Sequence, residues 1–298
     1  MYIGLDIGGT KILGCLVDEK TIIQSFKEKT QGQDSAEIIL EQIKNVCRNL
    51  MGDRKIGGIG IGMPGNINKD TGVVVFSPNL PFKDFPMKQL LEKEFKIPVA
   101  IGNDVNMGLL GEHWAGAAAS YRNVVGIFIG TGIGGAIILD NKLYHGHHHI
   151  AGEIGHMKIK LNGPLCNCGE TGCFEALASK LGIQRYLEKN GFHFDSIIKS
   201  SFLKEQLGKN NKTVKNVLKK VSGYIGEVTG NVVNILDPEA IILGGGVMES
   251  VGDYMLKKIK PVANARALAK PTIKLSALKD YAVVYGAVRL ISTLNKKA

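Results

Sequence analysis

Short apolar runs and amphipathic segments alternate along the first half of the chain. Residues 2–5 and 12–17 are apolar and β-prone, and Gly8-Gly9-Thr10 separates them, which predicts a β-hairpin. Apolar residues at helical spacing predict a helix over residues 35–50, and the apolar run at 56–61 predicts another strand. This alternation is typical of an α/β fold.

Two longer helical patterns lie in the second half. Valine, leucine and isoleucine recur at helical intervals over residues 213–236, and Asp237-Pro238 ends this pattern, so we expect a long buried helix. The apolar positions of residues 281–294 predict a final helix that packs against the body of the protein.

The N-terminal hairpin motif occurs twice. Residues 126–132 (GIFIGTG) align with residues 4–10 (GLDIGGT), and the wide spacing of the copies indicates a duplicated domain and not a short solenoid repeat. We therefore place a first α/β domain at residues 1–117 and a second at 118–282, and we expect ligand to bind between them.

Composition and charge argue against several classes of protein. The 298 residues include 37 Lys and Arg against 27 Asp and Glu, a formal charge of +10, and 44% are hydrophobic, enough for a normal core. The basic residues are mostly lysines without interleaved aromatic residues, so we expect no nucleic-acid partner. The longest uncharged stretch, residues 123–139, is glycine-rich and too short to span a membrane. Because the first residues lack the features of a secretory signal, we expect a cytoplasmic protein.

Three glycine-rich turns are candidate nucleotide-binding elements. Residues 6–11 (DIGGTK) combine backbone N–H groups with a carboxylate, a hydroxyl and an ammonium group, which suits a polyphosphate and its Mg²⁺. The alternative is a structural turn in which glycine supplies a positive φ and Asp6 caps the hairpin. A second glycine loop at residues 130–135 favours phosphate binding. The third, Gly244-Gly245-Gly246, suits either a nucleotide or a plain strand-to-helix turn.

Asn103-Asp104 stands between an apolar, strand-like segment and a helical pattern. The commonest use of Asn or Asp at such a place is an N-cap, and by spacing alone this interpretation is preferred. The alternative is that Asp104 accepts a proton from a substrate hydroxyl while Asn103 orients the substrate.

One short segment has the composition of a metal site. It contains a Cys₃His set, which matches the usual ligands of structural Zn²⁺: His156, Cys166, Cys168 and Cys173. Reduced core thiols are the alternative, and disulfides are disfavoured because five cysteines leave one unpaired. Cys15 and Cys47 lie in apolar patterns, so we expect them to be buried.

Other polar residues flank this segment. The histidines at 145, 147, 148 and 149 suggest a second metal site, but a solvated loop is the preferred interpretation. Glu153 and Glu175 bracket the Cys₃His segment, so a metal-folded loop would hold both carboxylates where they can accept hydrogen bonds from sugar hydroxyls.

Four motifs occur in a fixed order along the chain: Asp6-Ile7-Gly8-Gly9-Thr10-Lys11, Asn103-Asp104, Gly152-Glu153-Ile154-Gly155-His156 and Cys166-x-Cys168-Gly169-x-x-Gly172-Cys173-x-Glu175. Together they resemble the ROK family of bacterial sugar kinases and repressors. The resemblance implies a two-lobed, actin-like (ribonuclease-H-type) α/β fold with a zinc-binding loop, in which a C-terminal helix at about residues 283–298 completes the first lobe. It also implies a homodimer.

The same resemblance implies an ATP:hexose 6-phosphotransferase. Asp104 would be the general base that takes the proton from the sugar 6-hydroxyl as it attacks the γ-phosphate of Mg-ATP. The sugar would be bound by Gly65, Asn66, Asn79, Asn103, Asp104, Glu153, His156 and Glu175. ATP would be bound by Asp6, Gly8, Gly9, Thr10, Lys11, Thr131, Gly132, Gly244 and Gly245, with Asp6 also helping to hold Mg²⁺. Zinc would shape the sugar pocket without touching phosphate.

The substrate is less sharply defined by these motifs. Residues 77–81 (SPNLP) are similar to a segment of the family's glucokinases, so glucose is the leading substrate. The sequence departs from that segment at Phe82, where many glucokinases have a glycine and a tryptophan. N-Acetylmannosamine, N-acetylglucosamine, fructose and allose remain alternatives. A non-catalytic sugar-binding regulator is the alternative of a different class, and a structural ATPase of the actin-like group is a weaker one. The family's repressors carry a helix-turn-helix before the glycine motif, which here begins at Asp6, so we expect no DNA-binding domain.

Overall fold

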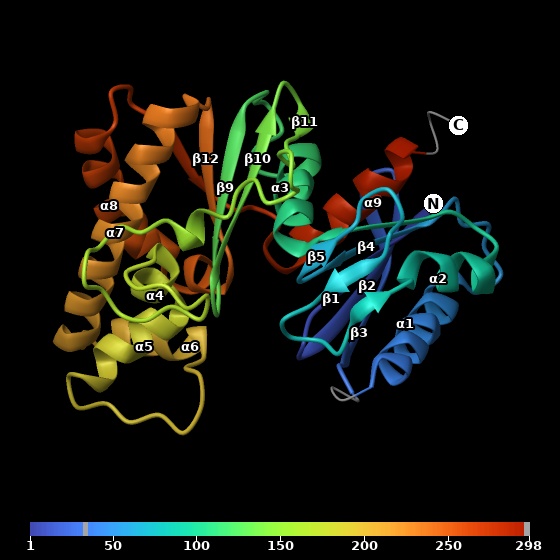
Figure 1. Cartoon of the computed structure of the whole chain (residues 1–298), viewed down its shortest axis with the longest axis horizontal. Coiled ribbons are helices and arrows are strands. Elements are labelled where there is room, and N and C mark those ends of the chain that lie inside the picture. The colour runs from blue at the N-terminus through green and yellow to red at the C-terminus, as the bar shows by residue number, and fades with distance from the viewer. Residues whose placement is uncertain (32–34, 295–298) are drawn as a thin grey trace. The chain divides into compact units, whose positions relative to one another are not determined.

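The computed structural model describes residues 1–31 and 35–294, and the chain forms two compact units (Figure 1). Unit 1 comprises Met1–Ala119 together with Asp280–Ala298, and unit 2 comprises Ser120–Lys279. The expected last residues of the C-terminal helix, 295–298, lie outside the described residues.

Unit 1 is built on a five-stranded sheet in the order β3-β2-β1-β4-β8. Its strands are β1 (Tyr2–Ile7), β2 (Lys11–Asp18), β3 (Thr21–Lys29), β4 (Ile59–Met63) and β8 (Val99–Asn103). β1 and β2 form the predicted hairpin, with Ile7 opposite Ile12, and β4 and β8 continue the sheet in parallel. The strand predicted at 56–61 in fact begins at Ile59, because pairing starts where that residue meets Ile3 of β1.

Helices cover both faces of this sheet. α1 (Ala36–Met51) is the predicted helix, and the hydroxyl of its N-cap Ser35 accepts a hydrogen bond from the Ile38 N–H. Alternation along β2 separates the two faces: Ile12 and Leu16 belong to the core cluster that includes α1, whereas Leu13 and Val17 pack with the final helix α9 (Ala282–Leu294).

The α9 helix also packs closely on α3 (Asp104–Ala115) and on the central strands. A Cβ atom at Gly60 of β4 would lie 2.0 Å from the Ala287 carbonyl oxygen, and one at Gly286 would lie 1.8 Å from the Met107 carbonyl oxygen. Glycine is therefore required at both positions, because no side chain fits between these backbones.

The remaining elements of unit 1 form a smaller layer. A three-stranded sheet has the order β5-β6-β7, with β5 (Asn66–Ile67), β6 (Val74–Phe76) and β7 (Lys83–Phe85). α2 (Met87–Phe95) follows it and contributes Met87 and Leu91 to the same core as α1.

Unit 2 repeats this plan. Its sheet has the order β11-β10-β9-β12-β13, again with a central antiparallel hairpin followed by two parallel strands. The strands are β9 (Val124–Ile129), β10 (Ile133–Leu139), β11 (Lys142–Leu143), β12 (Ala240–Gly244) and β13 (Thr272–Leu275). Ile129 pairs with Ile133 across the second glycine turn, as Ile7 pairs with Ile12 across the first. The repeated motif in the sequence therefore corresponds to a repeated topology.

The helices of unit 2 supply most of its core. They are α4 (Phe174–Ala178), α5 (Lys180–Glu188), α6 (Ser200–Gly208), α7 (Lys212–Leu236) and α8 (Gly246–Arg266), preceded by a 3₁₀ turn, η1 (Ile154–His156). The long α7 is the predicted helix; it ends at Leu236, and its C-cap Asp237 adopts a left-handed conformation before Pro238. Its apolar face packs with residues of the sheet and of α8.

The helices and the cysteines can be compared with two further expectations from the sequence. None of the helices in the described ranges is both long and apolar enough to cross a bilayer. All five cysteines are free, and Cys15 and Cys47 are buried, as predicted.

Candidate active site and metal centre

The first glycine turn is held close to other backbone of unit 1. The Gly8 N–H donates to the Lys11 carbonyl, and the Thr30 hydroxyl donates to the Gly8 carbonyl at 2.7 Å. Neither Gly8 nor Gly9 has a positive φ, so the expectation that glycine supplies one in this turn is wrong. A Cβ at Gly9 would lie 2.9 Å from the Asn79 carbonyl oxygen, and this close approach is what requires glycine there.

Acidic groups of unit 1 gather around the end of β1. Burial, followed by the charge of Asp104, raises the pKa of Asp6 to about 7. Lys11 opposes this effect, and its Nζ lies 3.0 Å from Asp280 Oδ2. A bound cation would likewise relieve the mutual repulsion of Asp6 and Asp104, and carboxylate oxygen is the ligand type that Mg²⁺ prefers. The residues present therefore fit a magnesium site.

Asn103 is the N-cap of α3, as the spacing predicted. Its Oδ1 accepts hydrogen bonds from the N–H groups of Val105 and Asn106, and its Nδ2 donates to the Gly65 carbonyl at 3.3 Å. Gly65 has a φ of 117°, and a Cβ there would lie 2.2 Å from the Phe76 carbonyl oxygen. The cap thus fixes both the first residue of α3, Asp104, and the turn before β5.

Several residues around these groups escaped the sequence analysis. Asp280 and Thr30 contact the first glycine turn from distant points of the chain, and no motif marks either of them. Asn106 Oδ1 and Ser77 Oγ are buried without a hydrogen-bond partner, and each residue lies two positions from a predicted site residue. Buried polar atoms of this kind are uncommon and mark places where a ligand group or water can bind. Asn66 and Asn79 are exposed.

The second glycine turn also joins two antiparallel strands, but it is one residue shorter than the first. The Gly130 N–H donates to the Gly132 carbonyl, and Thr131 at the tip is exposed. The third glycine run ends β12 and begins α8, so it is the strand-to-helix turn that was one of its two interpretations. Gly245 has a φ of 83°, and a Cβ there would lie 2.6 Å from the Ile129 carbonyl oxygen. Gly244 and Gly245 therefore lie against the strand that leads into the second turn.

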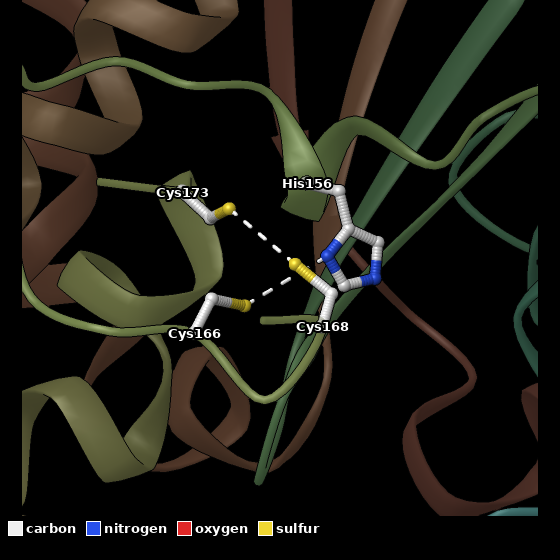
Figure 2. A group of neighbouring side chains, drawn as sticks. All are labelled: His156, Cys166, Cys168 and Cys173. Atoms are coloured by element: carbon white, nitrogen blue, oxygen red, sulfur yellow. Dashed lines mark hydrogen bonds between the residues drawn. The ribbon is translucent and has the colours of Figure 1, made fainter. Parts of the chain in front are cut away.

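The four residues of the Cys₃His set come together in unit 2. Their ligand atoms all lie within 4.8 Å of one another, with Cys166 and Cys173 buried and His156 and Cys168 exposed. Figure 2 shows the three sulfur atoms and His156 Nδ1 turned toward a common point, with Cys168 Sγ 3.8 Å from Cys173 Sγ and Cys166 Sγ 3.8 Å from Nδ1. Three thiols and one imidazole around one point are a tetrahedral donor set for Zn²⁺. The donor chemistry therefore fits a structural zinc ion.

The thiols of this cluster differ in acidity. The backbone N–H of Glu170, together with the neighbouring cluster side chains, lowers the pKa of Cys168 to about 7, although desolvation opposes it. Burial instead raises the pKa of Cys166 to about 12. Zinc binds thiolate, so a bound ion would favour the ionised form of all three cysteines.

The predicted sugar-binding residues of unit 2 surround this cluster. His156 presents Nδ1 to the thiols, while its Nε2 lies 3.9 Å from Glu153 Oε2. Glu175 lies two residues after Cys173, in the first turn of α4, and is partly buried. The upstream histidines form two edge-to-face ring pairs, His145 with His149 and His147 with His148. Among the described residues, these histidines do not join a group of three or more metal-ligand side chains.

The candidate residues thus fall into two sets. Unit 1 brings together the first glycine turn, Asn79, the acidic groups and the Asn103 cap, with Gly65 beside it. Unit 2 brings together the second and third glycine turns, the Cys₃His cluster and its two flanking glutamates.

Comparison with known proteins assigns this arrangement to a family. The profile of the ROK family matches residues 2–293. The chain belongs to the ROK family. It is 35% identical over 287 residues to a glucokinase from Halalkalibacterium halodurans, covering 90% of this chain and 87% of that protein. It is 32% identical to a xylose repressor from Caldicellulosiruptor bescii, covering 97% of this chain and 77% of the repressor.

A solved ROK structure extends the likeness to the fold. The ROK family glucokinase from Streptomyces griseus, crystallised with glucose and AMPPNP, matches with a TM-score of 0.85 and 29% identity over 98% of this chain and 99% of that one. The expected actin-like α/β fold of the ROK sugar kinases is therefore confirmed.

Proposed function

We propose that this ROK protein is an ATP-dependent hexose kinase that phosphorylates the 6-hydroxyl, with glucose as the leading substrate. The observation that carries the proposal is that Asp6 and Asp104 are near enough in unit 1 for the charge of Asp104 to raise the pKa of Asp6, at the end of the strand that leads into the first glycine turn. A phosphoryl-transfer enzyme needs a base for the attacking hydroxyl, groups that hold a magnesium nucleotide, and backbone donors for phosphate. The glucokinase relatives support the same conclusion.

Asp104 is the proposed base. It begins α3, where the Asn103 cap fixes its backbone and the Val105 N–H donates to its Oδ1 at 2.9 Å. The carboxylate takes the proton of the 6-hydroxyl, the hydroxyl oxygen bonds to the γ-phosphorus, and the bond to the β–γ bridging oxygen breaks. The products are a hexose 6-phosphate, ADP and the proton on Asp104, which then passes to solvent. Positioning of the hydroxyl supplies much of the rate enhancement.

The remaining roles are the ones that the resemblance to the family implies. Sugar hydroxyls would be bound by Gly65, Asn66, Asn79, Asn103, Glu153, His156 and Glu175, and nucleotide by Gly8, Gly9, Thr10, Lys11, Thr131, Gly132, Gly244 and Gly245. Asp6 would help to hold Mg²⁺, which would supply positive charge beside the transferred phosphate. His156, Cys166, Cys168 and Cys173 would hold Zn²⁺, which would fix the backbone next to Glu153 and Glu175.

A sugar-responsive regulator without catalysis is the second candidate. The observation that favours it is the similarity to the xylose repressors, which extends over almost all of this chain. Such a protein would bind its sugar without releasing ADP. It needs no base, so the position of Asp104 favours the kinase.

The test is ADP release from Mg-ATP by the purified protein, with glucose, N-acetylmannosamine, N-acetylglucosamine, fructose, allose and xylose offered separately and a blank without sugar. We expect glucose to give the highest kcat/KM and a 6-phosphate by ³¹P NMR. A preference for another hexose would support the kinase reaction but show that glucose is not the main substrate. Sugar binding without ADP release from any sugar would favour the regulator.

A further inference from the structure

One carboxylate in unit 2 contacts both the Cys₃His cluster and the second glycine turn. Glu175 Oε2 accepts a hydrogen bond from the Ile133 N–H at 2.8 Å, and Glu175 Oε1 lies 3.7 Å from Cys166 Sγ. Ile133 is the first residue of β10, directly after the turn. The side chain therefore connects a metal-ligand residue with the end of a turn that is expected to bind phosphate.

The backbone after Cys173 reaches the other end of the same turn. α4 begins at Phe174, α5 begins at Lys180, and the Lys180 N–H donates to the Gly130 carbonyl at 2.9 Å. Residues 173–180 thus hold the turn at both of its ends, through Gly130 and Ile133. We call residues 173–180 the clamp, and its first residue, Cys173, is itself a member of the Cys₃His cluster.

The packing at Gly132 shows how closely the clamp fits. A Cβ at Gly132 would lie 2.3 Å from Glu175 Oε2, so any larger residue would have to displace that carboxylate. Gly132 does not adopt a positive φ. Glycine is required here by the position of Glu175 and not by the conformation of the turn.

We propose that Glu175 is a positioning residue through which the Cys₃His cluster fixes the turn at residues 130–133, and with it the affinity for the phosphates of the nucleotide. This inference rests on the proposed function, because it assumes that the turn binds phosphate. It also extends the role of the cluster beyond the sugar pocket. A turn that binds phosphate through its peptide N–H groups binds well only when those groups are held in the correct direction.

The first experiment measures nucleotide affinity without turnover. Calorimetry with Mg-AMPPNP, in the absence of sugar, is run on the zinc-loaded protein and on its Glu175→Ala and Glu170→Gln variants. We expect Glu175→Ala to weaken nucleotide binding about tenfold, the size expected for losing a hydrogen bond to a charged group. Glu170→Gln is the matched control, because this exposed carboxylate lies in the same loop and pairs only with Lys158 among the described ion pairs. It should stay within about twofold.

A double-mutant cycle separates the clamp from a general loss of structure. Gly132→Ala should weaken nucleotide binding by displacing Glu175. The double variant should then bind nucleotide no more weakly than whichever single variant has the lower affinity. Fully additive losses would overturn the proposal, because they would mean that the two residues act independently.

A second readout requires neither nucleotide nor activity. Removal of zinc should raise hydrogen exchange in the peptide that covers residues 126–137, and Glu175→Ala should raise it in the zinc-loaded protein. Unchanged exchange in both would overturn the coupling between cluster and turn. Glu175 is not one of the four ligand residues, so its variant is expected to keep the metal, and the zinc content of the sample checks this. The test then holds even if the zinc-free protein unfolds.

These outcomes are distinct from failure of the proposed function. If the wild-type protein binds Mg-AMPPNP and Glu175→Ala weakens only sugar binding, the kinase stands and the clamp is wrong. If the wild-type protein does not bind nucleotide, the kinase proposal and the nucleotide part of this inference both fail.

Discussion

Lys11 Nζ lies 3.0 Å from Asp280 Oδ2, which joins the first glycine turn to the segment that leads into α9. Lys27 Nζ approaches the same carboxylate at 3.6 Å. Lys11 is the cation expected to face the phosphates, so Asp280 determines where that cation rests. We therefore expect Asp280 to position the Lys11 side chain.

Replacing Asp280 should reduce nucleotide affinity. In Asp280→Asn the Lys11 ammonium loses its partner, and we expect the KM for ATP to rise about threefold to tenfold, as for a partly exposed charge pair, with a smaller effect on the KM for sugar. Lys27→Gln is the control, because it removes the weaker contact and leaves Lys11 in place. Steady-state kinetics on both variants measure the effect, and equal KM values for ATP in Asp280→Asn and wild type would contradict it.

The same pair predicts a dependence of stability on pH. Burial would raise the pKa of Asp280, but the hydrogen bond and charge of Lys11, with the charge of Lys27, hold it below its usual value. A carboxyl whose pKa is lowered on folding adds stability above its unfolded pKa, near 4, and loses it as the pH falls through the folded value. Because the Asp280 side chain is 48% exposed, we expect only about 0.5–1 kcal/mol. Urea unfolding should show Asp280→Asn less stable than wild type at pH 7 and equal to it near pH 2.

Loss of the metal should weaken the sugar site. We expect Cys168→Ser to lose zinc, because it removes one of the four ligand side chains, and to weaken sugar binding at least tenfold through the flanking Glu153 and Glu175. Asn167→Ala is the control, since this exposed residue lies between two ligands and belongs to no metal-ligand group. Mass spectrometry for zinc and calorimetry with glucose measure the two effects. Unchanged sugar affinity in protein shown to be free of zinc would rule out this role.

Two glycines should respond to alanine in opposite directions. Gly60→Ala should destabilise unit 1 by about 2–4 kcal/mol, because the new methyl group would overlap the Ala287 carbonyl of α9. Gly223→Ala, in the middle of α7 with nothing near its Cβ position, should stabilise the protein by about 0.5–1 kcal/mol. Thermal unfolding measures the Tm of both variants. Similar shifts in Tm would show that β4 and α9 do not approach as closely as the structure indicates.

The sequence predicted what depends on local pattern. The two hairpins, α1 and α7 follow from apolar periodicity, and the Cys₃His cluster follows from ligand types that lie close together along the chain. The N-cap at Asn103 likewise depends only on its neighbours.

Contacts between distant segments could not be predicted in this way. Asp280 meets Lys11 only because α9 returns to the first sheet, and the Glu175 bond to Ile133 depends on how α4 packs against β10. The start of β4 at Ile59 depends on its register with β1. Neither the spacing nor the residue types of these segments carry that information.

The most direct test of the kinase proposal is the rate of ADP formation by wild type and Asp104→Asn with Mg-ATP and the preferred sugar. The amide keeps the shape of the side chain at the start of α3 but cannot take the proton, so we expect kcat to fall about 10²–10⁴-fold while the Kd for sugar stays within about threefold. Circular dichroism and glucose calorimetry on the same samples confirm that the variant is folded and binds. Near-normal turnover by Asp104→Asn would contradict the assignment of the base, and no turnover by the wild type with any hexose would contradict the kinase.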